Sequence, residues 1–296
     1  MADFKFFIIP RSRTGGTLLA TMLNAHPEVS MGYEIYPDLL IGADGNPFLS
    51  TELIQRLDNS RTADNEQWVK SLEIDNFRTF ASRARRSGLE PQTLIDILIQ
   101  FDSEGNSLEL ISGRMDFIEA LLNRQAYEVN KPFVGGKMRV DPEILFARHP
   151  EALYFMMLRD GRDVLDSRLR VGKFKTTPES CAIEWSEDIV GFENFLKKTG
   201  AKGCLVPYEK LVENPEKVLF LIMEMAGLEF HPQMVDFANA TQPLFNSSHG
   251  HLSSKQLSEG LSTTSIGRWK NGLSSQQLEE FMSVAADQMI RFSYIL

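Results

Sequence analysis

The sequence predicts an α/β fold in which a parallel sheet carries helices on both faces. Short apolar runs, rich in β-branched and aromatic residues, indicate strands near residues 4–9, 132–137, 153–158 and 203–207. Segments with helical spacing follow the first and third of these runs directly. Strands that alternate with helices are typical of a parallel sheet, and such sheets bind ligands across the carboxyl ends of their strands.

The first strand leads into a turn that is suited to bind an anion. The turn consists of Arg11, Ser12, Arg13, Thr14, Gly15, Gly16 and Thr17. Its two glycines let the backbone approach a ligand closely, and its two threonines supply hydroxyl groups. The helix that follows presents unpaired N–H groups and a partial positive charge, to which the two arginines add permanent cations. We therefore expect a phosphate group here, although an ordinary strand-to-helix connection would also contain glycines.

The turn lacks the lysine of a Walker A loop, which argues against an ATP site of that type. A Walker A loop ends in Gly-Lys followed by Ser or Thr, and no lysine follows Gly16. Residues 13–17, Arg-Thr-Gly-Gly-Thr, instead resemble the 5′-phosphosulfate loop of sulfotransferases, which use 3′-phosphoadenosine 5′-phosphosulfate (PAPS) as donor. The resemblance implies PAPS as cofactor, adenosine 3′,5′-bisphosphate as product, contacts from residues 11–17, and no metal ion. It also implies a sheet of the P-loop nucleotide kinase type.

A second element, at residues 152–171, has the same strand-to-helix order. The apolar run 153–158 ends at Arg159, and Asp160 is placed to cap the helix that follows. In sulfotransferases an arginine at the end of this strand and a serine eight residues later bind the 3′-phosphate, and the matching residues are Arg159 and Ser167. Without the first loop, this charged run would equally suit a solvated helix start.

Two later segments extend the resemblance. The segment that begins at Tyr208 resembles the strand end and helix that follow the 3′-phosphate element. The segment GRWK, which begins at Gly267, resembles the part that closes over the nucleotide, without the family's fuller Arg-Lys-Gly form. Tyr208, Gly267 and Arg268 are therefore candidate nucleotide contacts. Trp269 suits either a core position or packing against adenine.

Residues 26–37, HPEVSMGYEIYP, resemble a stretch of the tyrosylprotein sulfotransferases and their bacterial relatives. In that group an acidic residue of this stretch removes the proton of the acceptor hydroxyl, and Glu34 is the matching position. A carboxylate in a partly closed pocket can have its pKa raised toward this task. The alternative is a surface carboxylate in a loop. His26 suits a turn or a helix end, and the distant His249 and His251 are either alternative bases or a flexible surface pair.

Charge on the leaving oxygen requires cations beside the transferring group. Lys137 ends a short apolar segment and resembles a family lysine found before the 3′-phosphate strand. The resemblance implies that Arg13 and Lys137 stabilise this charge from two sides. Arg13 replaces the lysine of most small-molecule sulfotransferases, and because arginine keeps its proton it suits electrostatic stabilisation rather than acid catalysis. Arg139 is a secondary candidate.

Residues 38–130 are expected to form a helical insertion within a single domain that spans residues 1–296. Apolar spacing predicts helices at 51–57, 66–87, 91–101 and 115–129. Such an insertion would cover the active site and shape the acceptor pocket. Its basic run, Arg83, Arg85 and Arg86, either helps to shape that pocket or lies on a solvated helix face, and we expect the solvated face. Residues 241–265 are polar and serine-rich, which is typical of a mobile loop and here resembles one near the donor.

Composition limits the possible partners. The chain has 296 residues and a formal net charge of −9, which argues against a broad surface for nucleic acid or anionic membranes. Cys181 and Cys204 are expected to be core thiols, and no third ligand joins His249 and His251 in a metal site. No apolar stretch approaches membrane-spanning length, and the run before Pro10 is too short for a signal peptide, so we expect a soluble, cytoplasmic enzyme.

Together the motifs predict a sulfotransferase that moves a sulfuryl group from PAPS to an acceptor hydroxyl by in-line attack. A glycan, a tyrosyl peptide, a lipid head group and a small metabolite all remain possible acceptors, and the oligomeric state stays open. One alternative is a nucleotide-dependent kinase, which the missing Walker lysine disfavours. The other is a non-catalytic nucleotide-binding module, which would keep Arg159 and the first loop but would have no need of Glu34.

Overall fold

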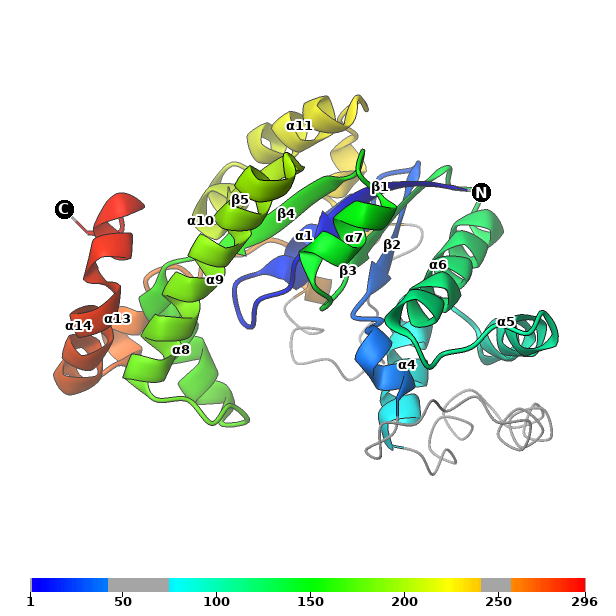
Figure 1. Cartoon of the computed structure of the whole chain (residues 1–296). Coiled ribbons are helices and arrows are strands. Elements are labelled where there is room, and N and C mark those ends of the chain that lie inside the picture. The colour runs from blue at the N-terminus through cyan, green and yellow to red at the C-terminus, as the bar shows by residue number, and fades with distance from the viewer. Residues whose placement is uncertain (1, 42–74, 241–256, 296) are drawn as a thin grey trace.

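The computed structural model describes residues 2–41, 75–240 and 257–295 of the chain (Figure 1). The predicted helix at 51–57 and the first part of the predicted helix at 66–87 lie outside the described residues. His249, His251 and most of the serine-rich segment also lie outside them.

A five-stranded parallel sheet forms the centre of the described structure, which confirms the predicted fold class. Its spatial order is β2-β3-β1-β4-β5. The strands are β1 (Asp3–Ile8), β2 (Val29–Tyr33), β3 (Phe133–Lys137), β4 (Leu153–Leu158) and β5 (Lys202–Pro207). Because all the strands run in one direction, their carboxyl ends meet at one edge of the sheet.

The strand β2 was not among the predicted strands. Its sequence, VSMGY, contains serine and glycine and lacks an apolar run, yet all five residues are buried. Gly32 allows a close approach of α6, because a Cβ there would lie 2.3 Å from Leu122 Cδ2 and the leucine side chain would have to shift. A buried edge strand that is packed against a helix does not require an apolar side chain at each position.

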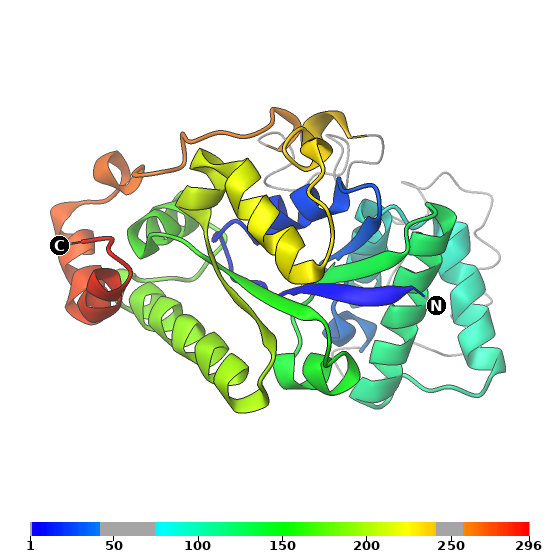
Figure 2. The same cartoon turned by 90° about the horizontal axis from the view of Figure 1, so that it is seen from above.

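Helices cover both faces of the sheet, as Figure 2 shows from above. One face packs against α6 (Ile111–Glu128), α7 (Pro142–Arg148) and α9 (Pro178–Thr199). The other face packs against α1 (Gly16–Asn24), α10 (Tyr208–Glu213) and α11 (Pro215–Ala226). The sheet therefore has a hydrophobic core on each side.

The strand β1 shows how the sequence supplies both cores at once. Phe7 and Ile9 join the core under α6 and α9, whereas Phe6 and Ile8 join the core under α1. Successive side chains of a strand point to opposite faces, so an unbroken apolar run is what a strand covered on both faces requires. Each fully buried phenylalanine contributes about 1.5–3 kcal/mol relative to exposure.

The described part of the predicted insertion between β2 and β3 consists of helices joined by short turns. It contains the short helix η1 (Pro37–Leu40) and then α4 (Asp75–Arg86), α5 (Pro91–Ser103) and α6. Among these, α4 packs beside both η1 and β2. This packing places one face of α4 near the carboxyl end of β2.

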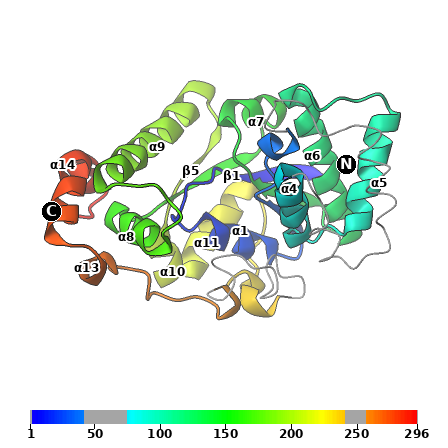
Figure 3. The same ribbon diagram turned by 90° about the horizontal axis from the view of Figure 1, so that it is seen from below.

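The chain after β4 builds the other side of the same sheet edge. Helix α8 (Gly161–Val171) follows β4, and Asp160 caps it as predicted, because its Oδ1 accepts the N–H of Arg162 at 2.9 Å. The short helices η2 (Pro232–Met234) and η3 (Phe237–Asn239) follow α11. From residue 257 the chain passes α10 and α8 to reach α13 (Trp269–Gly272), and α14 (Ser275–Arg291) then packs on α9 (Figure 3).

Candidate active site

A cavity of about 510 Å³ opens at the carboxyl ends of the strands. The β1–α1 turn, the ends of β2, β3 and β4, helices α4 and α8, and the segment 257–268 all contribute to its wall. The predicted site residues that line it are Arg11, Ser12, Arg13, Gly15, Gly16, Thr17, Glu34, Lys137, Arg159, Ser167, Tyr208 and Arg268. Thr14 and Gly267 do not line it.

The β1–α1 turn depends on its first glycine. Gly15 has a φ of 103°, in the left-handed region, and a Cβ there would lie 2.5 Å from Cδ2 of Tyr208. Only glycine meets both conditions without strain. Thr14 is buried beneath the turn, where its Oγ1 donates to the carbonyl of Arg11 at 3.0 Å, so Thr14 stabilises the turn from inside.

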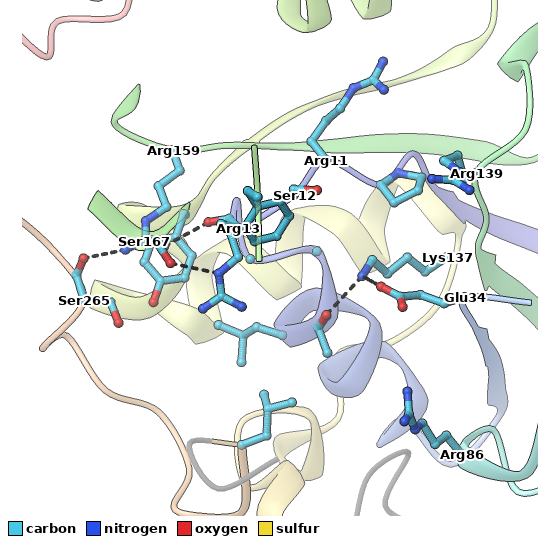
Figure 4. Close-up of a pocket in the computed structure, with 18 of the residues that line it drawn as sticks. Arg11, Ser12, Arg13, Glu34, Arg86, Lys137, Arg139, Arg159, Ser167 and Ser265 are labelled. Carbon is cyan, nitrogen blue, oxygen red and sulfur yellow. Dashed lines mark hydrogen bonds and ion pairs between the residues drawn. The ribbon is translucent and has the colours of Figure 1, made fainter. Parts of the chain in front are cut away.

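One side of the cavity carries a lysine and a carboxylate in direct contact (Figure 4). The Nζ of Lys137, at the end of β3, lies 2.6 Å from Oε1 of Glu34, just after β2, and donates to Oγ1 of Thr17 at 3.1 Å. The N–H of Glu34 donates to the carbonyl of Lys137 at 2.9 Å. This pair exists because β2 and β3 are neighbours in the sheet, with Tyr33 opposite Lys137.

The charge state of Glu34 follows from this pairing. Burial raises the pKa of its carboxyl, but the nearby charge of Lys137 and the hydrogen bond from it prevail and lower that pKa to about 2. The expectation that the pocket raises this pKa is therefore wrong. Burial lowers the pKa of the Lys137 ammonium, and the charge of Glu34 opposes that shift. Glu34 is not a surface carboxylate, since its side chain is only 18% exposed.

The other side of the cavity gathers the predicted 3′-phosphate residues. The Nε of Arg13 donates to Oγ of Ser167 at 2.8 Å, although the two residues are 154 positions apart. Arg159 donates to the carbonyl of Arg13 at 3.0 Å and to that of Ser265 at 2.6 Å, and its guanidinium lies 4.6 Å from the Tyr208 ring centroid. Arg13 thus points toward Ser167 and away from Lys137 (Figure 4).

The positive charges of this second group act on one another. Burial lowers the pKa of Arg13, and the charges of Arg159 and Arg268 lower it further. Arg159 is buried, and within the described part of the chain its Nε has no hydrogen-bond partner. A buried donor without a partner is unfavourable, and a phosphate oxygen would satisfy it.

The segment after residue 265 is fastened to α8 by one carboxylate. The two oxygens of Asp163 accept the backbone N–H groups of Gly267 at 2.7 Å and Trp269 at 2.9 Å. The Nε of Arg268 lies 3.1 Å from Oδ2 of Asp166 and reaches the cavity. The Trp269 ring lies 3.9 Å from the Arg162 guanidinium and outside the cavity wall, so it packs on protein.

Sequence reasoning missed part of the cationic wall. Arg83 and Arg86 line the cavity, so the prediction that this run faces solvent is wrong for these two residues. Their spacing of three places them on one face of α4, which was the available signal. Lys173 and Phe174, just after α8, also line the cavity. Nothing in their local sequence distinguished them.

The wall contrasts in charge with the whole chain. Among the described lining residues one carboxylate, Glu34, faces nine cations: Arg11, Arg13, Arg83, Arg86, Lys137, Arg139, Arg159, Lys173 and Arg268. Arg11 is paired with Asp188 at 2.9 Å. The chain as a whole carries a formal net charge of −9. A cationic cavity in an acidic chain concentrates anionic ligands at one place.

Three further predictions concern residues outside the wall. His26 is buried, its Nε2 lies 2.9 Å from the carbonyl of Glu229, and it stands two residues after α1, as expected for a helix-end residue. Cys181 is buried and Cys204 half-buried, and neither is in a disulfide. The described residues contain no group of three or more potential metal-ligating side chains and no helix long and apolar enough to cross a membrane.

Comparison with known proteins gives consistent matches. A family model described as "Sulfotransferase family" matches residues 6–232. Protein-tyrosine sulfotransferase A of Caenorhabditis elegans is 25% identical over 283 residues, which cover 94% of this chain and 63% of that protein. Protein-tyrosine sulfotransferase 2 of Gallus gallus is 25% identical over 228 residues, covering 75% of this chain and 50% of that protein. The chain thus spans about half to two thirds of the length of these relatives.

Two solved structures share the fold. The sulfotransferase domain from the Synechococcus PCC 7002 olefin synthase superposes with a TM-score of 0.60 at 19% identity, covering 100% of this chain and 97% of that one. The sulfotransferase domain from the curacin biosynthetic pathway superposes with a TM-score of 0.56 at 18% identity, covering 95% and 96%.

Proposed function

This chain belongs to the sulfotransferase family, and we propose that it transfers a sulfuryl group from PAPS to the hydroxyl group of an acceptor. The observation that carries this proposal is the pair of cationic groups on two sides of one cavity, around Lys137 and around Arg159. PAPS has an anion at each end, a 5′-phosphosulfate and a 3′-phosphate, so one molecule would satisfy both groups.

In this proposal the β1–α1 turn and the N-terminus of α1 bind the 5′ end. The N–H groups at the start of α1, the Thr17 hydroxyl and the Lys137 ammonium supply donors there. Arg159 and Ser167 bind the 3′-phosphate, which would give the unpartnered Nε of Arg159 an acceptor. Tyr208, Arg268, Arg11 and Ser12 complete the nucleotide site.

The chemical step would divide between a base and cations. Glu34 takes the proton of the acceptor hydroxyl, whose oxygen attacks sulfur in line with the bond to the bridging oxygen. That bond breaks, and its electron pair leaves with adenosine 3′,5′-bisphosphate. Lys137 stabilises the charge that gathers on the bridging oxygen. Arg13 points toward Ser167, so its proposed share in this stabilisation requires its side chain to turn.

For the acceptor we propose a tyrosine of a protein, by similarity to the relatives that bear this activity in their names. The cationic wall supports an acceptor with negative charge near its hydroxyl. Arg83 and Arg139 lie 4.7 and 4.9 Å from the ring centroid of Tyr36, beside Glu34, and are separate from the groups assigned to the nucleotide. Acidic residues beside the tyrosine would pair with them.

Ligand binding tests the donor first. Adenosine 3′,5′-bisphosphate is expected to raise the melting temperature, because a ligand that binds only the folded state stabilises it. ATP with Mg²⁺ is expected to have little effect. The reverse ranking would support a kinase and refute the proposal.

Activity then tests the acceptor and the base. Incubation with PAPS should add one sulfuryl group, detected by mass, to a tyrosyl peptide with acidic neighbours. A peptide with neutral neighbours and a tyrosine-to-phenylalanine peptide are the matched controls. Glu34→Gln should abolish most turnover, and turnover equal to the wild type would refute the base assignment. Nucleotide binding without any transfer would favour the non-catalytic module.

A further inference from the structure

In the structure the Glu34 carboxylate is occupied by cationic neighbours and is not free to act as a base. Its Oε1 lies 2.6 Å from Nζ of Lys137, and its Oε2 lies 4.0 Å from a guanidinium nitrogen of Arg83. A carboxylate held this way does not readily accept a further proton, and the cationic neighbours hold its pKa at about 2 after outweighing burial.

The lysine that holds Glu34 is the same lysine that the proposed reaction needs elsewhere. An ammonium group has three N–H donors. In the structure one contacts Glu34 and one contacts Thr17, while the ammonium also lies 4.7 Å from the Tyr33 ring centroid. A phosphosulfate entering the β1–α1 turn would compete with the Glu34 carboxylate for these donors.

The surroundings allow the carboxylate to move without the backbone. Glu34 has a φ of 52°, its N–H donates to the carbonyl of Lys137 at 2.9 Å, and its carbonyl accepts from Arg83 at 3.1 Å. The backbone is therefore held on both sides, while the carboxylate is held by the contact of 2.6 Å with Lys137 and by a hydrogen bond with Tyr33.

Resting on the proposed function, we infer that Lys137 keeps Glu34 in an unreactive ion pair until the phosphosulfate of the donor displaces the carboxylate. The base then becomes available only when the donor is in place. Donor binding therefore precedes productive acceptor binding.

The charged and titratable groups around Glu34 support this exchange. Lys137 faces it from β3, Arg83 and Arg86 from α4, and Tyr33 and Tyr36 from its own segment. Of these, Lys137 lowers the pKa of Glu34 most strongly. Loss of that contact raises the pKa toward its ordinary value, which is the direction that a general base requires.

The first test measures the affinity for adenosine 3′,5′-bisphosphate by titration calorimetry. Glu34→Gln should bind this nucleotide about tenfold more tightly than the wild type, because Lys137 no longer has to leave a carboxylate; this factor corresponds to about 1.4 kcal/mol. Glu28→Gln, which removes an exposed carboxylate from the same segment, should bind like the wild type.

A double-mutant cycle separates the ion pair from general charge repulsion. In a Lys137→Met background, Glu34→Gln should increase the affinity for adenosine 3′,5′-bisphosphate by about twofold or less. Equal or weaker binding by Glu34→Gln overturns the inference, and so does a gain of the same size in both backgrounds. Absence of nucleotide binding by the wild type overturns the proposed function instead, so the two failures are distinguishable.

A second measurement does not depend on the folding of the Lys137 variant. With ¹³C-carboxyl glutamate, the Glu34 resonance is identified by its absence in Glu34→Gln. Its titration midpoint should rise when adenosine 3′,5′-bisphosphate is added to the wild type. A midpoint unchanged by a nucleotide that calorimetry shows to be bound overturns the exchange of partners.

Discussion

The substitution Asp163→Asn tests how the segment over the cavity is held. Asp163 has no exposed surface. Its two carboxylate oxygens accept the N–H groups of Gly267 at 2.7 Å and Trp269 at 2.9 Å. Asparagine is almost the same shape but replaces one oxygen with an NH₂ group, so one of these N–H groups would face another donor.

The expected magnitude follows from these two bonds. A hydrogen bond to a charged acceptor contributes about 1.5–3 kcal/mol, and a buried donor left without a partner costs about 1–3 kcal/mol. The free energy that holds residues 265–272 against α8 should therefore fall by roughly 2–4 kcal/mol. Because Arg159 donates to the carbonyl of Ser265, undocking would also disturb the proposed 3′-phosphate site.

Hydrogen exchange is the direct assay. The amides of Gly267 and Trp269 should exchange roughly 30 to 1,000 times faster in Asp163→Asn, while amides in the central strands keep their protection. Glu151→Gln, which removes an exposed carboxylate at the far end of the sheet, is the matched control. Wild-type exchange rates for both amides in Asp163→Asn would refute the assignment of Asp163 as the anchor of this segment.

Three further predictions concern glycines and pH. Gly203→Ala should lower the free energy of unfolding by about 3 kcal/mol and Tm by roughly 5 °C, because its Cβ would lie 1.9 Å from the carbonyl oxygen of Tyr154; Gly191→Ala in α9, with nothing within 4 Å of its Cβ, should raise stability by about 0.5–1 kcal/mol. A calorimetric melt that ranks these two variants alike would contradict the packing argument. Gly15→Ala should weaken nucleotide binding at least about tenfold, since a φ of 103° and a Cβ 2.5 Å from the Tyr208 ring both oppose the turn; unchanged affinity in a titration would count against the turn as the binding element. Because the pKa of Glu34 is lowered from 4.5 to about 2, its ion pair stabilises the fold fully above pH 4.5 and this stabilisation is lost as pH falls toward 2; the stability difference between wild type and Glu34→Gln, measured by denaturant unfolding, should shrink over that range, and a constant difference would be inconsistent with the pairing.

The local features of the site were readable from the sequence. The glycine turn at residues 13–17 and the helix cap at Asp160 depend on hydrogen bonds and steric limits within a few residues. Four of the five strands were also predicted, and the clearest is β4, whose six apolar residues are all buried as a strand covered on both faces requires. The fifth strand, β2, was not predicted, because its burial depends on the helix that packs over it.

The sequence by itself determined the fold class, the glycine turn and the family, because these follow from patterns within short stretches. Only the tertiary structure decided which of the charged residues meet. Arg13 bonds with Ser167 across 154 positions, and Glu34 pairs with Lys137 across 103. Both contacts arise from the spatial order β2-β3-β1-β4, which brings remote strand ends to one edge of the sheet. The spacing of residues along the chain does not indicate that order.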